Sequence, residues 1–235
     1  MGHYEKLEDV AASDLLRWAI ETYEGRFAIA TSFQKEGMIL LDLAWRTGLP
    51  FRAFTVDTGR LPEETYSIME EVQQRYGLTV EIVNPDPAET GSMMQEHGPN
   101  LFFRSPEKRQ LCCDVRKVRP FERKLKEFDA WATGLRRGQG KTRAAVPKVG
   151  EDAGRLKLAP VADWSLEQVE AYTRKHDVPV HPLYAQGYTS IGCAPCTRPL
   201  QEGEDERAGR WWWEVGALKE CGIHFSPNGL IRLAS

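Results

Sequence analysis

The sequence has no long hydrophobic run, no strong excess of charge of either sign and few cysteines. Its 31 basic residues nearly balance 34 acidic ones, and the net charge of −3 disfavours a protein that binds nucleic acids or membrane surfaces. No apolar run reaches the roughly 20 residues that cross a bilayer, because Asp42 ends the run at 38–41. The first residues lack the pattern of a secretory signal. We therefore expect a cytoplasmic protein that is not embedded in a membrane.

What is present is the composition of a folded domain. Of the 235 residues, 41% are hydrophobic and 28% are charged, as in ordinary globular proteins. At about 150 residues per domain, this length predicts one large domain, or one domain with a small appendage. We expect an α/β unit over residues 1–178 and a loop-rich C-terminal extension over residues 179–235 that belongs to the same domain.

Short apolar segments alternate with segments of helical periodicity. The expected strands are residues 27–30, 51–56, 79–83 and 130–133, and the expected helices are residues 13–23, 38–46, 62–76, 114–128 and 165–176. Residues 84–105 are less regular, and residues 134–154 are expected to form a basic, glycine-rich loop. The alternation predicts an α/β fold with a parallel sheet. Ligands bind beyond the carboxyl ends of such strands, so Ser32, the Asp57-Thr58-Gly59 turn and residues 134–137 are expected to share one crevice.

Two loops invite a phosphate-binding interpretation. Gly140-Lys141-Thr142 resembles the end of a P-loop, but Leu135 stands where that motif needs a glycine, and no clear helix follows. We therefore reject a P-loop that hydrolyses nucleoside triphosphates. The loop from Thr31 to Gly37 is the better candidate, because it leads into a helix whose N-terminal amides favour anions. A helix that is merely capped explains this loop equally well.

The spacing of the five cysteines separates four of them from the fifth. Cys193 and Cys196 form a C-x-x-C motif, in which one tight turn brings two thiolates to a single metal ion or cluster. The adjacent Cys112 and Cys113 are a weaker signal, since two small buried side chains before a helix give the same pattern. Together the two pairs favour a four-thiolate site for either zinc or a [4Fe–4S] cluster. An odd cysteine count without a secretory signal disfavours a disulfide framework.

The fifth cysteine, Cys221, lies near the C-terminus in a glycine-containing segment with His224. An exposed thiol near a histidine is a candidate nucleophile because the thiolate is the reactive form, and a stray surface cysteine is the alternative. Just before this segment, Arg207 and Arg210 stand beside three consecutive tryptophans, where they could bind a phosphate-like group. A solvated charged face with tryptophans in the core gives the same pattern.

Taken together, these residues resemble the assimilatory adenylyl-sulfate reductases, the iron–sulfur branch of the phosphoadenylyl/adenylyl-sulfate reductase family. The matching motifs are Ser32-Phe33 with Glu36-Gly37, Val56 to Arg60, Cys112-Cys113 with Arg116-Lys117, Gly134 to Arg137, Cys193 to Cys196, Arg207 to Glu214, and Glu220 to His224. They follow the family's order and spacing over nearly the whole chain. The resemblance implies a Rossmann-like parallel sheet of the adenine nucleotide alpha hydrolase-like type, with residues 1–178 as the nucleotide-binding reductase part.

The resemblance also implies a reaction, the reduction of adenosine 5′-phosphosulfate to sulfite and AMP. The Cys221 thiolate would attack the sulfate sulfur and AMP would leave, after which thioredoxin or a similar dithiol would release sulfite from the cysteine S-sulfonate. A [4Fe–4S] cluster with a structural and electrostatic role would be held by Cys112, Cys113, Cys193 and Cys196. No nucleic-acid or membrane partner is expected.

The resemblance implies roles for further residues. The positive charge that faces the phosphosulfate would come from Lys117, Arg207 and Arg210. The contacts to the nucleotide would come from Ser32, Asp57, Thr58, Gly59 and either Arg136 or Arg137. The catalytic set implied is Cys221, Lys117 and His224.

Three alternatives remain open on the sequence alone. Some cluster-containing relatives accept the 3′-phosphorylated substrate, whose extra charge the basic stretch from Arg136 to Arg143 could tolerate. An ATP pyrophosphatase or tRNA-thiolating enzyme is disfavoured, because residues 32–37 depart from the Ser-Gly-Gly-x-Asp-Ser loop of that class. A structural zinc module is the non-enzymatic alternative, against which the net charge and the crevice argue.

The sequence stops at Ser235 without the thioredoxin-like domain of plant-type members, so a separate reductant protein is expected.

Overall fold

The computed structural model describes residues 4–214, 220 and 222–224. Within them, six strands form one sheet in the order β3-β2-β1-β4-β6-β5. The strands are β1 (Phe27–Ala30), β2 (Arg52–Val56), β3 (Glu81–Val83), β4 (Ala130–Thr133), β5 (Val149–Asp152) and β6 (Arg155–Leu158). Strand β5 pairs antiparallel with β6, and the other pairings are parallel. The predicted α/β class is therefore confirmed, and the sheet is parallel as predicted except for β5.

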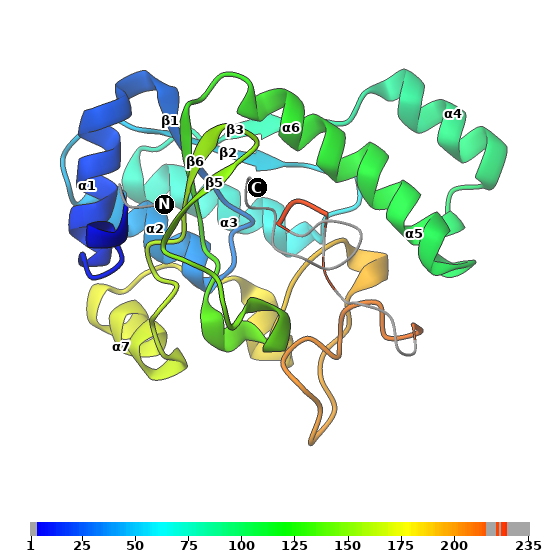
Figure 1. Cartoon of the computed structure of the whole chain (residues 1–235). Helices are drawn as coiled ribbons and strands as arrows, with labels where there is room; N and C mark the ends of the chain where they lie inside the picture. Colours follow the sequence, from blue (N-terminus) through cyan, green and yellow to red (C-terminus); the bar gives the residue numbers. More distant parts are fainter. Residues whose placement is uncertain (1–3, 215–219, 221, 225–235) are drawn as a thin grey trace.

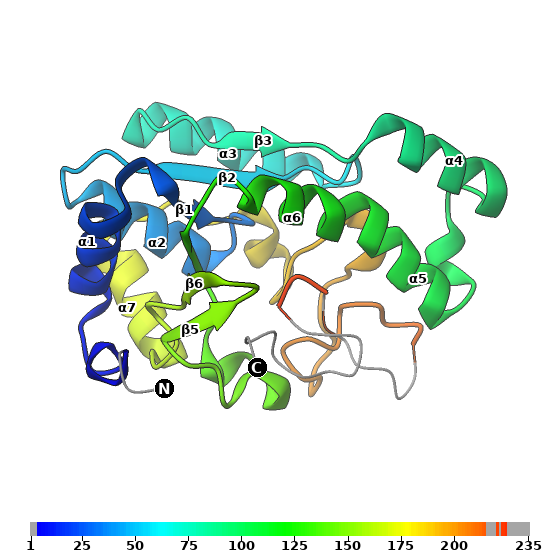
Figure 2. The same ribbon diagram turned by 45° about the horizontal axis from the view of Figure 1, so that its top comes forward.

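Helices cover both faces of this sheet, as Figures 1 and 2 show. They are α1 (Ala12–Tyr23), α2 (Lys35–Trp45), α3 (Glu63–Tyr76), α4 (Pro87–His97), α5 (Pro106–Cys113), α6 (Arg119–Leu125) and α7 (Leu166–His176). One face packs on α1, α2 and α3, with α7 against α2, and the other packs on α6. Helices α4 and α5 lie at the opposite end of the molecule from α1. None of the described helices is long and apolar enough to cross a membrane.

The central strands are apolar on both sides because both faces of the sheet are covered. In β1, Phe27 and Ile29 belong to the core under α1 and α2. Ala28, between them, belongs to the cluster on the opposite face, with Phe121 and Trp131. Successive side chains of a strand point to opposite faces, so a short run that is apolar at every position fits a central strand of this sheet.

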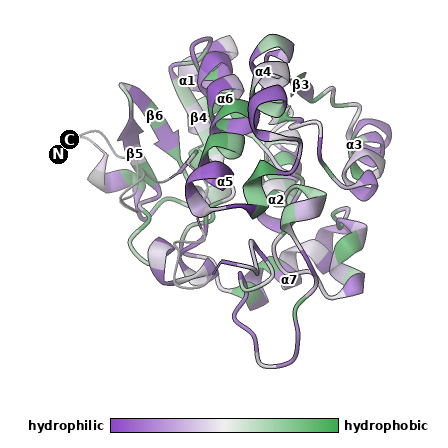
Figure 3. Ribbon diagram, turned by 90° about the vertical axis from the view of Figure 1, so that its right-hand side faces the viewer, coloured by the Kyte–Doolittle hydropathy of each residue, from purple (hydrophilic) through white to green (hydrophobic). Residues whose placement is uncertain are grey.

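Helix α2 is buried along almost its whole length, and Figure 3 shows hydrophobic residues on it. Its fully buried Asp42 accepts hydrogen bonds from the Tyr76 hydroxyl at 3.1 Å and the Tyr172 hydroxyl at 2.7 Å. Arg46 donates to the same carboxyl group at 2.6 Å. These partners compensate the cost of burying a polar group, and they tie α2 to α3 and α7.

Several elements agree with the sequence-based expectations. Strands β1 and β4 have the predicted bounds, and α1, α3 and α7 agree with the expected helices to within one residue. Helix α7 begins at a capping box formed by Ser165 and Gln168. There the Gln168 backbone N–H donates to the Ser165 hydroxyl at 3.1 Å, and the Ser165 N–H donates to the Gln168 side chain at 2.7 Å.

Two of the expected helices have other boundaries than predicted. Helix α2 begins at Lys35 rather than at residue 38, because Gln34 is already its N-cap and the polar first turn hid the start. The helix expected over 114–128 instead begins at Pro106 as α5, passes through a π-helical turn at Asp114–Val118, and ends at Leu125 as α6. The adjacent cysteines therefore end α5 rather than preceding a helix, and π-helical turns are frequent at functional sites.

Three elements were missed. Helix α4 lies in the segment read as irregular, where Asp86 caps it by accepting from the Ala88 and Glu89 backbone N–H groups. Strands β5 and β6 occupy the end of the expected basic loop and the residues after it. Their hairpin buries Lys157, whose ammonium lies 3.7 Å from the Asp152 carboxylate. A buried lysine of this kind breaks the apolar pattern by which strands are predicted.

Candidate active site

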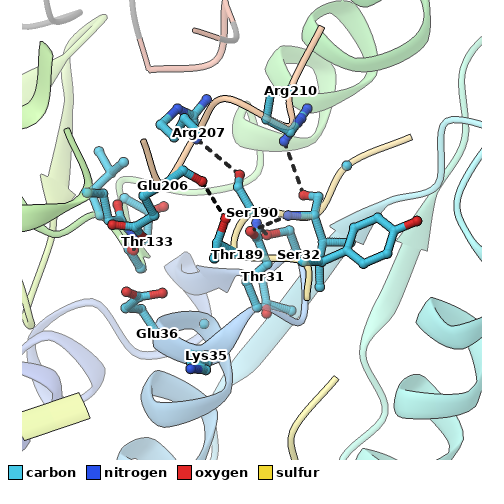
Figure 4. Close-up of a pocket in the computed structure, with 18 of the residues that line it drawn as sticks. Thr31, Ser32, Lys35, Glu36, Thr133, Thr189, Ser190, Glu206, Arg207 and Arg210 are labelled. Carbon is cyan, nitrogen blue, oxygen red and sulfur yellow. Dashed lines mark hydrogen bonds between the residues drawn. The ribbon is translucent and has the colours of Figure 1, made fainter. Parts of the chain in front are cut away.

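The carboxyl ends of β1, β2 and β4 border a pocket of about 570 Å³ (Figure 4). Ligands bind at this end of the sheet in open α/β folds, and the volume is typical of small-molecule sites. Ser32 and Gly134 line it, with the first turn of α2 and side chains from residues 184–210. His224, from the C-terminal segment, completes the wall. Segments far apart in the sequence thus share one cavity.

Side chains of both charges line this pocket. The cationic ones are Lys35, Lys117, Arg143, Arg207 and Arg210, and the anionic ones are Glu36, Glu170, Glu204 and Glu206. In Figure 4, Arg207 and Arg210 lie on one side of the pocket, and Lys35 and Glu36 lie on the opposite side. Arginines gathered on one wall favour a ligand with an anionic group at that end.

Two close approaches shape the loop between β1 and α2. Phe33 has a φ of 56°, and its backbone N–H donates to the Thr31 hydroxyl at 3.0 Å. A Cβ on Gly37 would lie 2.7 Å from that hydroxyl oxygen, and a Cβ on Gly134 would lie 2.7 Å from the Gly37 nitrogen. Glycine is therefore needed at both positions for the loops after β1 and β4 to meet beside Ser32.

The adjacent Arg136 and Arg137 point in different directions, and neither is among the residues that line the pocket. Arg136 is buried and donates from Nε to the Glu36 carboxylate at 3.0 Å, and its Nη2 lies 3.7 Å from Glu206. Arg137 donates to the Val146 carbonyl and to the carboxylate of Glu8. Only Arg136 therefore contacts carboxylates of the pocket wall.

Arg210 joins the pocket to the C-x-x-C motif. Its guanidinium donates to the Ile191 carbonyl at 3.2 Å and lies 4.6 Å from the centre of the Trp211 ring. A Cβ on Gly192 would lie 2.3 Å from this guanidinium, so glycine leaves the space that Arg210 fills. Trp211 in turn donates its backbone N–H to the Cys196 carbonyl at 3.1 Å. The arginine and tryptophan segment therefore runs beside the cysteine motif.

The two cysteine pairs meet in one apolar cluster that includes Trp211. Cys112 and Cys196 are buried, Cys113 and Cys193 are partly buried, and none of these four forms a disulfide. Burial raises the pKa of the Cys112 thiol and raises the pKa of Cys196 to about 12. Among the described residues, no three His, Cys, Asp or Glu side chains converge closely enough to hold a single metal ion. Four thiols in apolar surroundings are nevertheless a donor set that suits a soft metal centre.

The Asp57-Thr58-Gly59 turn contacts these cysteines and does not line the pocket. The Thr58 hydroxyl oxygen lies 3.2 Å from the Cys193 sulfur, and the Ala194 N–H donates to the Arg60 carbonyl at 2.8 Å. The expected contact of this turn with a nucleotide stays a prediction.

His224 lines the pocket on the side of β4 and stacks on Trp131, with ring centres 6.0 Å apart and planes 12° apart. Burial, reinforced by the positive charges of Lys157 and Arg143, lowers the pKa of His224 well below its usual value. Its imidazole is therefore neutral at neutral pH. Cys221 lies outside the described residues.

Sequence reasoning missed three buried or partly buried carboxylates at this site, namely Glu36, Glu206 and Glu220. Acidic residues are unexpected in a pocket for an anion, although Glu36 and Glu220 stand within two of the matching motifs and Glu206 directly precedes a third. Burial raises the pKa of Glu206, although the charge of Arg136 opposes the shift. These carboxylates offset part of the positive charge and leave the arginines held by fixed partners.

Comparison with known sequences gives consistent matches. Residues 26–199 match the phosphoadenosine phosphosulfate reductase domain. The chain is 46% identical to an adenosine 5′-phosphosulfate reductase of Allochromatium vinosum, over 94% of this chain and 88% of that protein. It is 42% identical to 5′-adenylylsulfate reductase 1, chloroplastic, of Arabidopsis thaliana, over 94% of this chain and 49% of that protein.

Solved structures agree with these matches. A phosphoadenylyl-sulfate reductase from Candida auris, in a phosphate complex, superposes with a TM-score of 0.71 at 29% identity, covering 82% of this chain and 93% of that one. An FMN adenylyltransferase of Candida glabrata shares the fold alone, at a TM-score of 0.60 and 16% identity over 83% of this chain and 66% of that one. With three quarters of its length matched and close relatives at this identity, the chain belongs to the phosphoadenosine phosphosulfate reductase domain family.

Proposed function

We propose that this protein is an oxidoreductase that reduces adenosine 5′-phosphosulfate to sulfite and AMP in sulfate assimilation. One observation carries the proposal: Lys117, Arg207, Arg210 and His224 line a single pocket at the carboxyl end of the sheet. The similarity to proteins named adenosine 5′-phosphosulfate reductase supports this substrate.

In the proposed reaction, Lys117, Arg207 and Arg210 bind the doubly anionic phosphosulfate. Their charges are fixed before the substrate arrives, so they stabilise charge on the transferring group without rearrangement. Ser32 lies at the end of β1 beside the first turn of α2, where backbone N–H groups favour an anion. Arg136 acts through Glu36 and Glu206, which it holds at the wall of the pocket.

The nucleophile of the proposed reaction is the Cys221 thiolate. It forms a bond to the sulfate sulfur, the bond from sulfur to the phosphate oxygen breaks, and AMP leaves with the electron pair. One thiol of a dithiol protein such as thioredoxin then attacks the Cys221 sulfur and displaces sulfite, which leaves a mixed disulfide. The second thiol of that protein breaks the mixed disulfide and returns Cys221 as a thiolate, so the dithiol supplies both electrons as it becomes a disulfide. The positions of its near neighbours Glu220, Ile223 and His224 at the pocket support this role.

We further propose that Cys112, Cys113, Cys193 and Cys196 hold a [4Fe–4S] cluster. In such a cluster each thiolate binds a different iron, so the four sulfurs need not converge on one point as they do around zinc. The shared apolar surroundings of the four thiols support this choice. When bound, the cluster would supply structural order and fixed charge beside Lys117.

The two parts of the chain are proposed to form one domain, with residues 1–178 as the nucleotide-binding part and residues 179–235 as its extension. Side chains from both parts line the pocket, among them Thr133 from the first part and Ser190 from the second. A pocket built in this way requires both parts.

The proposal is tested by intact-protein mass spectrometry of anaerobically purified protein incubated with adenosine 5′-phosphosulfate. We expect a mass gain of one sulfonate group that maps to Cys221, disappears when thioredoxin is added, and is absent from Cys221→Ser. An adduct formed only with the 3′-phosphorylated substrate would change the substrate assignment. No adduct with either substrate would overturn the proposed function.

A further inference from the structure

Glu220 is a buried carboxylate to which the proposed reaction gives no role. One of its oxygens accepts from the Thr142 hydroxyl at 2.7 Å and from Arg143 Nε at 3.0 Å. The other accepts from Arg143 Nη2 at 2.8 Å and lies 3.2 Å from Arg207 Nη2. The carboxylate therefore accepts two parallel hydrogen bonds from Arg143 and forms an ion pair with Arg207. The two parallel bonds are the strong, bidentate form of contact between arginine and a carboxylate.

Both of these arginines line the pocket, and each has a second partner. Arg143 also donates to the Gln139 side chain at 2.6 Å, and Arg207 donates to the Ser190 hydroxyl at 3.3 Å. Each guanidinium is thus fixed from two sides, and Glu220 is the partner that they share. An arginine side chain with several rotatable bonds is held in one orientation only where such partners exist.

Burial opposes ionisation of Glu220, but the hydrogen bond from Arg143 and the charge of Arg207 outweigh it and lower its pKa. The group is therefore a carboxylate at neutral pH. It cancels one of the positive charges that an anionic ligand in the pocket would otherwise meet. This charge lowers the affinity of the pocket for an anionic ligand, so any benefit of Glu220 to the reaction comes from the groups that it holds in place.

The position of Glu220 in the chain indicates which groups it holds in place. Glu220 directly precedes Cys221 in the sequence, and Ile223 and His224, which follow, line the pocket. Resting on the proposed function, we infer that Glu220 is a positioning residue, whose carboxylate fixes Arg143 and Arg207 against the reacting group and anchors the segment that carries the nucleophile to the pocket wall. In this role Glu220 lowers the affinity for the ligand but keeps the nucleophile and the cations in a fixed arrangement.

This role predicts that binding and reaction change differently when the charge is removed. In Glu220→Gln, AMP is expected to bind as tightly as in the wild type or up to about fivefold more tightly, because one opposing charge is gone. The rate of sulfonate addition to Cys221 is expected to fall about tenfold to a hundredfold, because the cations and the segment lose their shared anchor. Damage to the fold would instead weaken both.

The experiment measures the AMP dissociation constant by calorimetry and the rate of sulfonate addition by quenched mass spectrometry, in wild type, Glu220→Gln and the control Glu202→Gln. Glu202 is an exposed glutamate of the same C-terminal part and is expected to leave both quantities unchanged. Thr142→Val removes one hydrogen bond to Glu220 and no charge, so it tests the same idea in a protein whose ion pairs are intact. It should slow the addition by about threefold to tenfold without weakening AMP binding.

The inference is supported if sulfonate addition slows while AMP affinity is kept or raised. It is overturned if both quantities fall in parallel, or if neither changes, in Glu220→Gln and Thr142→Val. A wild-type protein that binds AMP but forms no adduct would point to the proposed function itself as the failure.

Discussion

The hydroxyl oxygen of Thr58 lies 3.2 Å from the sulfur of Cys193, although 135 residues separate the two in the sequence. The backbone of the same loop accepts a hydrogen bond of 2.9 Å from Arg116, which lies in the π-helical turn directly after the adjacent cysteine pair. The loop after β2 therefore connects the C-x-x-C motif with the turn that follows the adjacent cysteine pair. Hydrogen bonds of this kind around metal ligands fix the ligands and tune the metal group they hold.

Removing the Thr58 hydroxyl should destabilise the proposed cluster. Thr58→Val keeps the shape of the side chain but loses the contact with Cys193, and we expect iron to be lost to a chelator about tenfold faster. Thr58→Ser keeps a hydroxyl and should resemble the wild type. The measurement is iron and sulfide per chain over time in the presence of the chelator, under anaerobic conditions. Equal rates in all three proteins would show that the contact does not support the cluster.

The cysteines should separate into two functional groups when they are replaced singly. Cys196→Ala is expected to abolish the cluster, because the buried sulfur is lost from the apolar site that collects all four thiols. Cys221→Ser is expected to keep iron, sulfide and AMP binding while losing sulfite release entirely. Metal analysis, the visible absorption spectrum and a sulfite assay distinguish the two. A Cys221→Ser protein that still turned over would refute its role as nucleophile.

Much of the fold could be predicted where a local sequence pattern follows from one physical cause, such as burial or the capping of a helix. The run Phe27–Ala30 is apolar because it is buried on both faces, and the start of α7 at Ser165 is specified by a capping box. Prediction failed where polar residues are buried with partners. Lys157 interrupts β6 because its partner Asp152 is contributed by the neighbouring strand, which no local pattern reveals.

The candidate site divides in the same way. Spacing grouped Cys193 with Cys196, and the structure brings this pair and the adjacent pair into one cluster. Sequence alone could not show that Arg136 and Arg137 point in different directions, because their partners Glu36 and Glu8 lie 100 and 129 residues earlier in the chain. Sequence analysis gave Glu220 no role for a similar reason, because its partners Arg143 and Arg207 are distant in the chain.

An ion-pair network at the edge of the sheet should make stability depend on pH. Hydrogen bonds from Arg52, at 2.8 and 3.0 Å, and from Lys124, at 2.5 Å, lower the pKa of Glu81 to about 2. Since the pKa is depressed in the folded state, the stabilisation is fully present above pH 4.5 and is lost as the pH falls toward 2. The network is partly exposed, so its contribution is about 1 kcal/mol.

Glu81→Gln should therefore be less stable than the wild type at pH 7, by that amount, and the difference should shrink below pH 4.5. Urea denaturation at pH 7, 4 and 3 measures it. Glu71→Gln, at an exposed position of α3, is the control and should show no such convergence. A difference for Glu81→Gln that stays constant down to pH 3 would argue that the ion pairs do not stabilise the fold.

The cations of the pocket should control capture of the substrate. Lys117 and Arg207 line the cavity and would each lie against the phosphosulfate, so Lys117→Ala and Arg207→Ala should lower kcat/KM by about a hundredfold or more. Lys141→Ala removes an exposed lysine of the nearby loop that does not line the pocket, and it should leave kcat/KM unchanged. Charge at the reacting group, rather than net charge of the protein, is what distinguishes the three variants. If both pocket variants kept wild-type kinetics while retaining their iron, the positive charge of this wall would have no part in the reaction.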